Sequence, residues 1–107
     1  MLRASAKQTE TEVDLRAIAH DDVDPVIEWG VELRQFATAL TRGDGVADAR
    51  AALVAAASPE AAERAAGVIA NFQMMNRILD ATGCPVHARM HPMAPLLDVE
   101  WDDPSRR

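Results

Sequence analysis

The chain has few of the residues that build disulfide frameworks or aromatic cores. It contains one cysteine, Cys84, and only four aromatic residues in 107, none of them tyrosine. A lone cysteine cannot form an internal disulfide, which is typical of proteins from a reducing compartment. Apolar residues make up 49% of the chain and alanine supplies much of that share, so we expect closely packed helices rather than a sheet sandwich.

Basic residues are also scarce. Eleven Lys and Arg oppose seventeen Asp and Glu, which gives a formal net charge of -6. Phosphate backbones and anionic lipid surfaces attract basic proteins, so we expect neither nucleic acid nor a membrane as a partner. The first ten residues contain no apolar run of signal-peptide length. The sequence therefore predicts a cytoplasmic protein.

The strongest pattern predicts one long amphipathic helix from about Pro59 to about Thr82. Ser58 supplies a capping hydroxyl, and Pro59 suits the first helical position because the backbone N–H that it lacks would have no partner there. Gly83 ends the helix, since glycine readily adopts the left-handed conformation that follows a helix C-terminus.

Along this helix apolar residues recur in alternating steps of four and three, which predicts a single buried face. We expect that face to contain Ala61, Ala65, Val68, Phe72, Met75 and Leu79. Ile69 and Ile78 widen it on either side. Gln73, Arg77 and Asp80 are expected to point away from the core.

A second helix is predicted to begin at Asp24-Pro25, where the acid caps and the proline starts the helix, and to run to about Leu40. Ile27 and Val31 fall on the side opposite to its inward stripe. A helix that is apolar on its back as well as its front favours coverage by another chain, so these two residues predict a subunit contact. The inward stripe has helical spacing and contains Val26, Trp29, Leu33, Phe36 and Leu40.

The turn at residues 41–45 separates this helix from a third one. Gly43 stops the second helix, and Asp44 is positioned to cap the next. The third helix is predicted over Val46 to Ala57. Its inward residues are Val46, Ala49, Leu53 and Ala57.

The ends of the chain carry weaker patterns. Thr9 and Glu12 have capping-box spacing, which predicts a short first helix over about residues 10–19. The prolines after Gly83 exclude another long helix. We therefore expect tails at residues 1–8 and 102–107 around a single all-α domain of about four helices at residues 9–101.

The run from Val68 to Val86 contains the pairs Asn71-Phe72 and Asn76-Arg77 and ends in Gly83-Cys84-Pro85. It resembles the closing helix of the alkylhydroperoxidase D / carboxymuconolactone decarboxylase-like family, which commonly carries an Asn-Phe…Asn-Arg pattern before a Gly-x-Pro turn. The upstream helices are similar too, so the resemblance covers roughly residues 25–97. It implies a small helical bundle that is completed by homo-oligomerisation or by a paired family subunit.

The redox branch of that family reduces hydroperoxides with a Cys-x-x-Cys pair and a nearby histidine and glutamate. This sequence contains no Cys-x-x-Cys, so none of those roles can be carried over, and no cofactor is expected. The first hypothesis is therefore a non-catalytic or degenerate oligomeric module that binds a partner or a small ligand. The second is a hydroperoxide-reducing or lactone-decarboxylating enzyme, completed by another chain or by residues of its own. A third is that this chain is the trailing piece of a longer unit.

The enzyme hypothesis would depend on Cys84, His87 and His91. Thiolate and imidazole are also zinc ligands, and Asp98 or Glu100 would complete a metal site. Against both roles, Cys84 follows a helix C-terminus, where the helix dipole disfavours a thiolate. We therefore expect a passive turn cysteine, solvated histidines and no bound metal.

Asn71, Asn76 and Arg77 are the most informative polar residues, because polar groups that border an apolar face must find partners if they are covered. They predict either a ligand pocket or a subunit contact. The alternative is that they are solvated on the flank of the helix.

Overall fold

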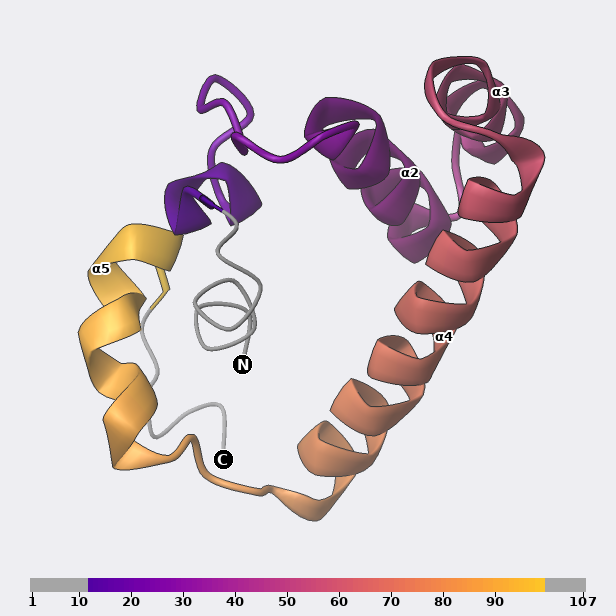
Figure 1. Ribbon diagram of the computed structural model, residues 1–107. Helices are drawn as coiled ribbons and strands as arrows, with labels where there is room; N and C mark the ends of the chain where they lie inside the picture. The colour runs from indigo at the N-terminus through magenta and orange to yellow at the C-terminus, as the bar shows by residue number, and fades with distance from the viewer. Residues whose placement is uncertain (1–11, 100–107) are drawn as a thin grey trace. The chain divides into compact units, whose positions relative to one another are not determined.

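The structure of the protein is a computed structural model that describes residues 12–99. Within that range every regular element is a helix and no strand occurs, which confirms the predicted all-α class. The predicted tails at residues 1–8 and 102–107 lie outside the described residues. The elements, in chain order and labelled in part in Figure 1, are η1 (Leu15–Ile18), α2 (Gly30–Arg42), α3 (Val46–Ala56), α4 (Pro59–Thr82), η2 (Ala88–Met93) and α5 (Ala94–Leu97).

The chain divides into two compact units. The helical unit, Glu28–Leu79, contains α2, α3 and nearly all of α4. The terminal unit combines the described residues up to Ile27 with those from Asp80 onward, and so contains η1, η2 and α5. The single domain over residues 9–101 stays a prediction.

The core of the helical unit lies where its three helices meet. Phe36 of α2, Leu53 of α3 and Ala62 of α4 are all buried, and Leu53 has no exposed surface at all. Burial of such side chains is the main favourable term in folding, so this cluster holds the three helices together. The half-buried residues packed against it are Leu33, Leu40, Val46, Ala49, Val54, Ala57, Ala65, Ala66 and Ile69.

The tight turn between α2 and α3 confirms the predicted stop at Gly43. Its φ is +71°, and its N–H donates to the carbonyl oxygen of Ala39 at 2.8 Å. Gly45 also has a positive φ, of +65°, and precedes α3 without any side-chain cap. The prediction that Asp44 caps α3 is therefore wrong, because Gly45 occupies the cap position.

The bounds of α4 agree with the prediction at both ends. The hydroxyl oxygen of Ser58 accepts a hydrogen bond from the N–H of Ala61 at 3.0 Å, which satisfies one of the free donors of the first turn. Gly83 follows the last residue with a φ of +66°. The helix has 24 residues and is therefore about 36 Å long.

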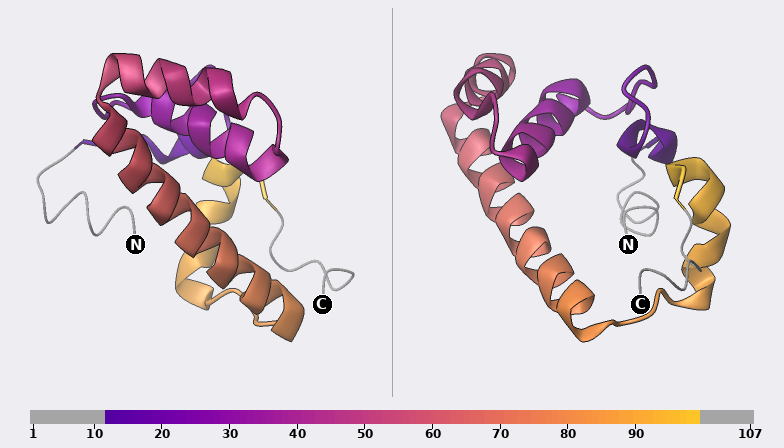
Figure 2. Two further views of the ribbon diagram at one scale, coloured as in Figure 1. Left: turned by 90° about the vertical axis from the view of Figure 1, so that its right-hand side faces the viewer. Right: turned by 180° about the vertical axis from the view of Figure 1, so that it is seen from behind.

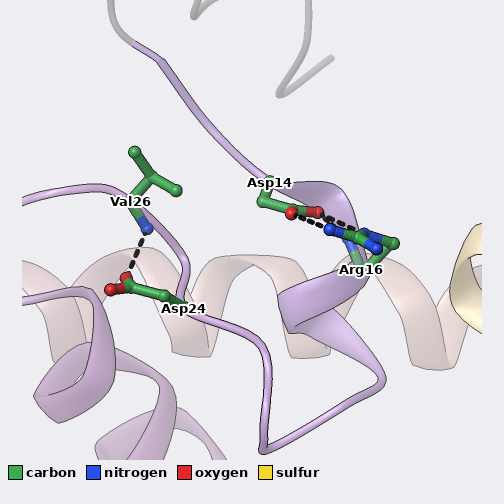
Figure 3. A network of polar contacts seen from close by, with 4 residues as sticks. All are labelled: Asp14, Arg16, Asp24 and Val26. Atoms are coloured by element: carbon green, nitrogen blue, oxygen red, sulfur yellow. Dashed lines mark hydrogen bonds and ion pairs between the residues drawn. The ribbon is translucent and has the colours of Figure 1, made fainter.

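The predicted start of α2 is wrong by about five residues, because the helix begins at Gly30. Figure 3 shows the cause: the Asp24 carboxylate accepts a hydrogen bond from the N–H of Val26 at 2.8 Å, which makes a local turn instead of a helix cap. Val26 and Trp29 then both have a positive φ, which no α-helix allows.

The later start of α2 changes the expected arrangement of Ile27 and Val31, which were predicted to share the outer side of one helix. Ile27 lies in a bend before the helix and only Val31 lies within α2, where it is 40% exposed. The two residues therefore do not form the back of one helix. Of the predicted inward stripe, Leu33, Phe36 and Leu40 do reach the core, and Val26 and Trp29 do not.

The terminal unit is built from short elements. Asp14 caps η1, and Ala17 is its buried residue, so the described part of the predicted first helix is shorter and begins later than expected. The cap predicted at Thr9 lies outside the described residues. Pro92 lies inside η2 and Pro95 in the first turn of α5, which keeps both elements short, and α5 packs against η1. Among the described helices, none has the length and apolar content needed to cross a membrane.

We expect Leu53→Ala to lower the free energy of unfolding of the helical unit by about 2–5 kcal/mol, because it leaves a cavity between three helices. Chemical denaturation followed by circular dichroism measures this. Val31→Ala, on an exposed position of α2, is the control and is expected to change the value by less than about 1 kcal/mol. Equal effects of the two substitutions would contradict the position of the core.

Candidate interaction surface on helix α4

One side of α4 packs against α2 and α3, and of the residues predicted to be buried only Ala65 and Ile69 lie on it. The side chains that reach the core are Ala62, Ala65, Ala66 and Ile69. Ala62, Ala66, Ile69 and Gln73 follow one another in steps of four, three and four, which places them along one line of the helix. The inward line of α4 therefore begins with small alanine side chains and continues to Ile69 and Gln73.

Gln73 continues this line, although the sequence predicted that it points away. Its side-chain amide donates a hydrogen bond to the hydroxyl oxygen of Thr41 on α2 at 2.8 Å. The Thr41 hydroxyl in turn donates to the carbonyl oxygen of Ala37 at 2.8 Å. Sequence analysis missed this link. The available signal was the spacing of Gln73 from Ala62, Ala66 and Ile69.

The larger apolar residues of α4 lie on a different side and are exposed. We define the α4 apolar face as Val68, Phe72, Met75, Ile78 and Leu79, whose exposed fractions are 57%, 41%, 41%, 56% and 45%. The predicted burial of these residues is therefore wrong. Successive residues of an α-helix are rotated by about 100° about its axis, so residues three or seven positions apart point to nearly the same side. Ala62 and Val68 are six positions apart, and their side chains point in directions that differ by about 120°.

The position along the helix adds to this exposure. Figures 1 and 2 show α2 and α3 beside the first turns of α4, while its later turns continue past them. Every residue from Met74 to Leu79 is exposed. A contiguous exposed face of large apolar side chains marks an interaction surface more often than an isolated apolar residue does.

Of the polar residues singled out in the sequence, Asn71 and Asn76 border this face, and Arg77 lies on the opposite side of the helix. Asn71, Asn76 and Arg77 are all exposed. The side-chain amide of Asn71 lies 3.7 Å from the sulfur of Met75, one turn further along the helix. Their predicted role in a ligand or subunit contact stays a prediction.

Cys84, His87 and His91 do not form a metal-binding group in the part of the chain that the structure describes. Cys84 is exposed, with its sulfur 3.8 Å from the carbonyl oxygen of Pro85. The Nδ1 atom of His87 accepts a hydrogen bond from the N–H of Arg89 at 3.1 Å, so this histidine caps η2. No three His, Cys, Asp or Glu side chains among residues 12–99 are grouped to hold a metal ion. Glu100, one of the two possible fourth ligands, lies outside that range.

An ion pair lies at the start of η1 (Figure 3). The Arg16 guanidinium donates to both carboxylate oxygens of Asp14, at 2.6 and 3.1 Å, and the Arg16 backbone N–H donates to the same carboxylate at 3.0 Å. These bonds from the Arg16 side chain and backbone lower the pKa of Asp14 below its usual value, and the side-chain hydrogen bond to Asp14 raises the pKa of Arg16. The pair is exposed and shapes a turn.

Comparison with protein-family models, with curated proteins and with solved structures gives no match to this chain. The resemblance to the alkylhydroperoxidase D / carboxymuconolactone decarboxylase-like family therefore rests on the sequence pattern of residues 68–86 and on the helices before it.

We expect the Asp14 carboxyl to titrate below the usual range of an aspartate, as measured by carbon-detected NMR. The folded-state pKa is depressed, so the contact stabilises the fold above the unfolded-state pKa and is lost as the pH falls through the folded-state value. Arg16→Gln is expected to return the titration midpoint of Asp14 toward that of an ordinary aspartate. Added salt should reduce the gap between the midpoint of Asp14 in the unsubstituted chain and that of an ordinary aspartate. A midpoint that Arg16→Gln leaves unchanged would contradict the contact.

Proposed function

We propose that this chain is a non-catalytic helical module that assembles with another polypeptide chain through the α4 apolar face. The observation that carries the proposal is the exposure of five large apolar side chains on one side of α4. The module would use a scaffold like that of the alkylhydroperoxidase D / carboxymuconolactone decarboxylase-like family, without its redox chemistry, and would work in the cytoplasm.

The size of the apolar face supports assembly of moderate strength. Because each of the five residues is 41% to 57% exposed, covering them corresponds to burying between two and three complete side chains. At 1.5–3 kcal/mol for each side chain, this contributes about 4–7 kcal/mol per chain. Association costs a similar amount in lost translational and rotational freedom, so the net affinity is modest.

The arrangement of the candidate catalytic residues supports a binding role over catalysis. The sequence has one thiol, and a single cysteine needs an external thiol to resolve the sulfenic acid that peroxide produces. His87 is engaged as a cap, and the described residues 12–99 contain no group of three His, Cys, Asp or Glu side chains that could hold a metal ion. No specific observation favours the enzyme hypothesis.

We expect Phe72→Glu to weaken association, because it places a charge within the surface that assembly would bury. Sedimentation velocity over a range of protein concentrations measures this. Ala70→Glu is the matched control, since Ala70 is also exposed on α4 but lies outside the apolar face. Association that resists Phe72→Glu, or that Ala70→Glu weakens equally, would contradict the proposal.

We also expect no hydrogen peroxide reduction above the buffer rate, with or without an added thiol reductant. Cys84→Ser should behave like the unsubstituted chain, because the thiol is exposed and its contact with the carbonyl oxygen of Pro85 is weak. A rate that depends on Cys84 would contradict the non-catalytic role and would favour the redox enzyme instead.

A further inference from the structure

The exposed stripe of α4 has the spacing of a helix that pairs with another helix. Val68, Phe72, Met75 and Leu79 follow one another in steps of four, three and four, which are the steps between a and d positions of a heptad. In this register Phe72 and Leu79 occupy a positions, and Val68 and Met75 occupy d positions. Each is between 41% and 57% exposed, so the seam is open.

The same stretch is nearly symmetric about its centre. Counted outward from the bond between Gln73 and Met74, Phe72 corresponds to Met75, and Val68 corresponds to Leu79. The flanking positions follow the same rule: Asn71 corresponds to Asn76, and Ile69 to Ile78. The sequence Val-Ile-Ala-Asn-Phe-Gln-Met-Met-Asn-Arg-Ile-Leu at residues 68–79 is therefore similar when read in either direction.

A helix with this symmetry complements itself in the antiparallel direction. When two copies run oppositely about a two-fold axis at the centre of the stretch, Phe72 of each copy faces Met75 of the other, and Val68 faces Leu79. An interface between identical chains must be self-complementary in this way, because the same patch supplies both sides. Each layer then joins an a position to a d position.

The register is determined by the large residues. A shift of one heptad in one direction places Phe72 opposite Thr82, and a shift in the other direction places Met75 opposite Ala65. Both alternatives replace a pair of large apolar side chains by a large and a small one. The centred register therefore buries the most apolar surface.

Local charge does not oppose a second copy as the occupant. The chain has a net charge of -6, so two copies repel one another at long range. The seam and its flanks between Val68 and Leu79 nevertheless contain no charged residue. Arg77 occupies the f position, on the side of the helix away from the seam. Pairing through this face desolvates no charge and brings no like charges into contact.

We infer that the α4 apolar face pairs with the same face of a second copy of this chain, as an antiparallel two-helix seam centred between Gln73 and Met74. This inference rests on the proposed function and names the partner.

The area predicts a dimer that dissociates on dilution. Covering the five side chains on both copies removes roughly 300–600 Å² of apolar surface from water. This area follows from dividing a burial energy of about 1.5–3 kcal/mol per complete side chain by about 25 cal/mol per Å². Stable interfaces bury about 1,200–2,000 Å² in total. The seam is therefore smaller than a stable interface, and we expect a weak dimer whose population rises with concentration.

Distances between spin labels on α4 test the arrangement. Glu63, Ala70 and Arg77 are all exposed and all occupy f positions, so cysteine-attached labels there point away from the seam. Each is introduced singly as Glu63→Cys, Ala70→Cys or Arg77→Cys in the full chain carrying Cys84→Ser. Double electron–electron resonance measures the distance between the two copies, and dilution with unlabelled chain confirms that the distance is intermolecular.

In the antiparallel seam, labels on Ala70 and Arg77 are each offset from their symmetry mates by seven residues, or about 11 Å along the axis at 1.5 Å per residue. Labels on Glu63 are offset by 21 residues, or about 32 Å. The expected result is equal distances at Ala70 and Arg77 and a longer one at Glu63. Adding Phe72→Glu to each labelled chain should abolish all three intermolecular distances.

The other outcomes separate the inference from the proposed function. Equal label-to-label distances at Glu63, Ala70 and Arg77 would mean that the two α4 helices run parallel. Any other order of the three distances would mean that the chains pair through a face other than the α4 apolar face. Either result overturns the antiparallel seam but leaves assembly standing. A chain that remains monomeric at the highest concentration it reaches, with no intermolecular distance, overturns both.

Discussion

The contact of Leu53 with Phe36 and Ala62 is the interaction on which the helical unit depends. It is the point where α2, α3 and α4 meet, and Leu53 is the largest side chain without exposed surface among the described residues. The glycine turn after α2 directs α3 back toward it, and the Ser58 cap starts α4 beside it. A core this small can cover only the first turns of a 24-residue helix. The rest of α4 extends beyond its own core.

This geometry gives α4 two different sides. The side turned toward α2 and α3 carries alanines, Ile69 and Gln73, and it is closed by the hydrogen bond from Gln73 to Thr41. The other side carries Phe72, Met75 and Leu79, which would contribute more energy if buried than the alanines do. A chain that turns small residues inward and leaves large ones exposed has a surface suited to an external partner. The near symmetry of residues 68–79 makes a second copy a fitting partner.

Sequence patterns predicted the elements that depend on local chemistry. The bounds of α4, the stop at Gly43 and the inward position of Leu53 follow from caps, glycine conformation and helical spacing, and the structure confirms them. The start of α2 was missed because the Asp24 side chain bonds to the nearby Val26 N–H, a competition that spacing does not reveal. The inward side of α4 was missed because spacing gives weight to the largest residues. The residues that reach the core are instead mostly alanines, and only the position of α2 and α3 decides between the two stripes. The roles proposed for Asn71, Asn76 and Arg77 depend on a partner and stay predictions.

Amide hydrogen exchange along α4 tests the central claim that the first half of the helix is stabilised by its own core and the second half by another chain. The account predicts that amides of residues 62–69 are protected at every protein concentration, because the Leu53 cluster covers them. Protection of residues 72–79 should be weak in dilute solution and rise with concentration as the apolar face is covered. Protection that is uniform along α4 and independent of concentration would contradict the account.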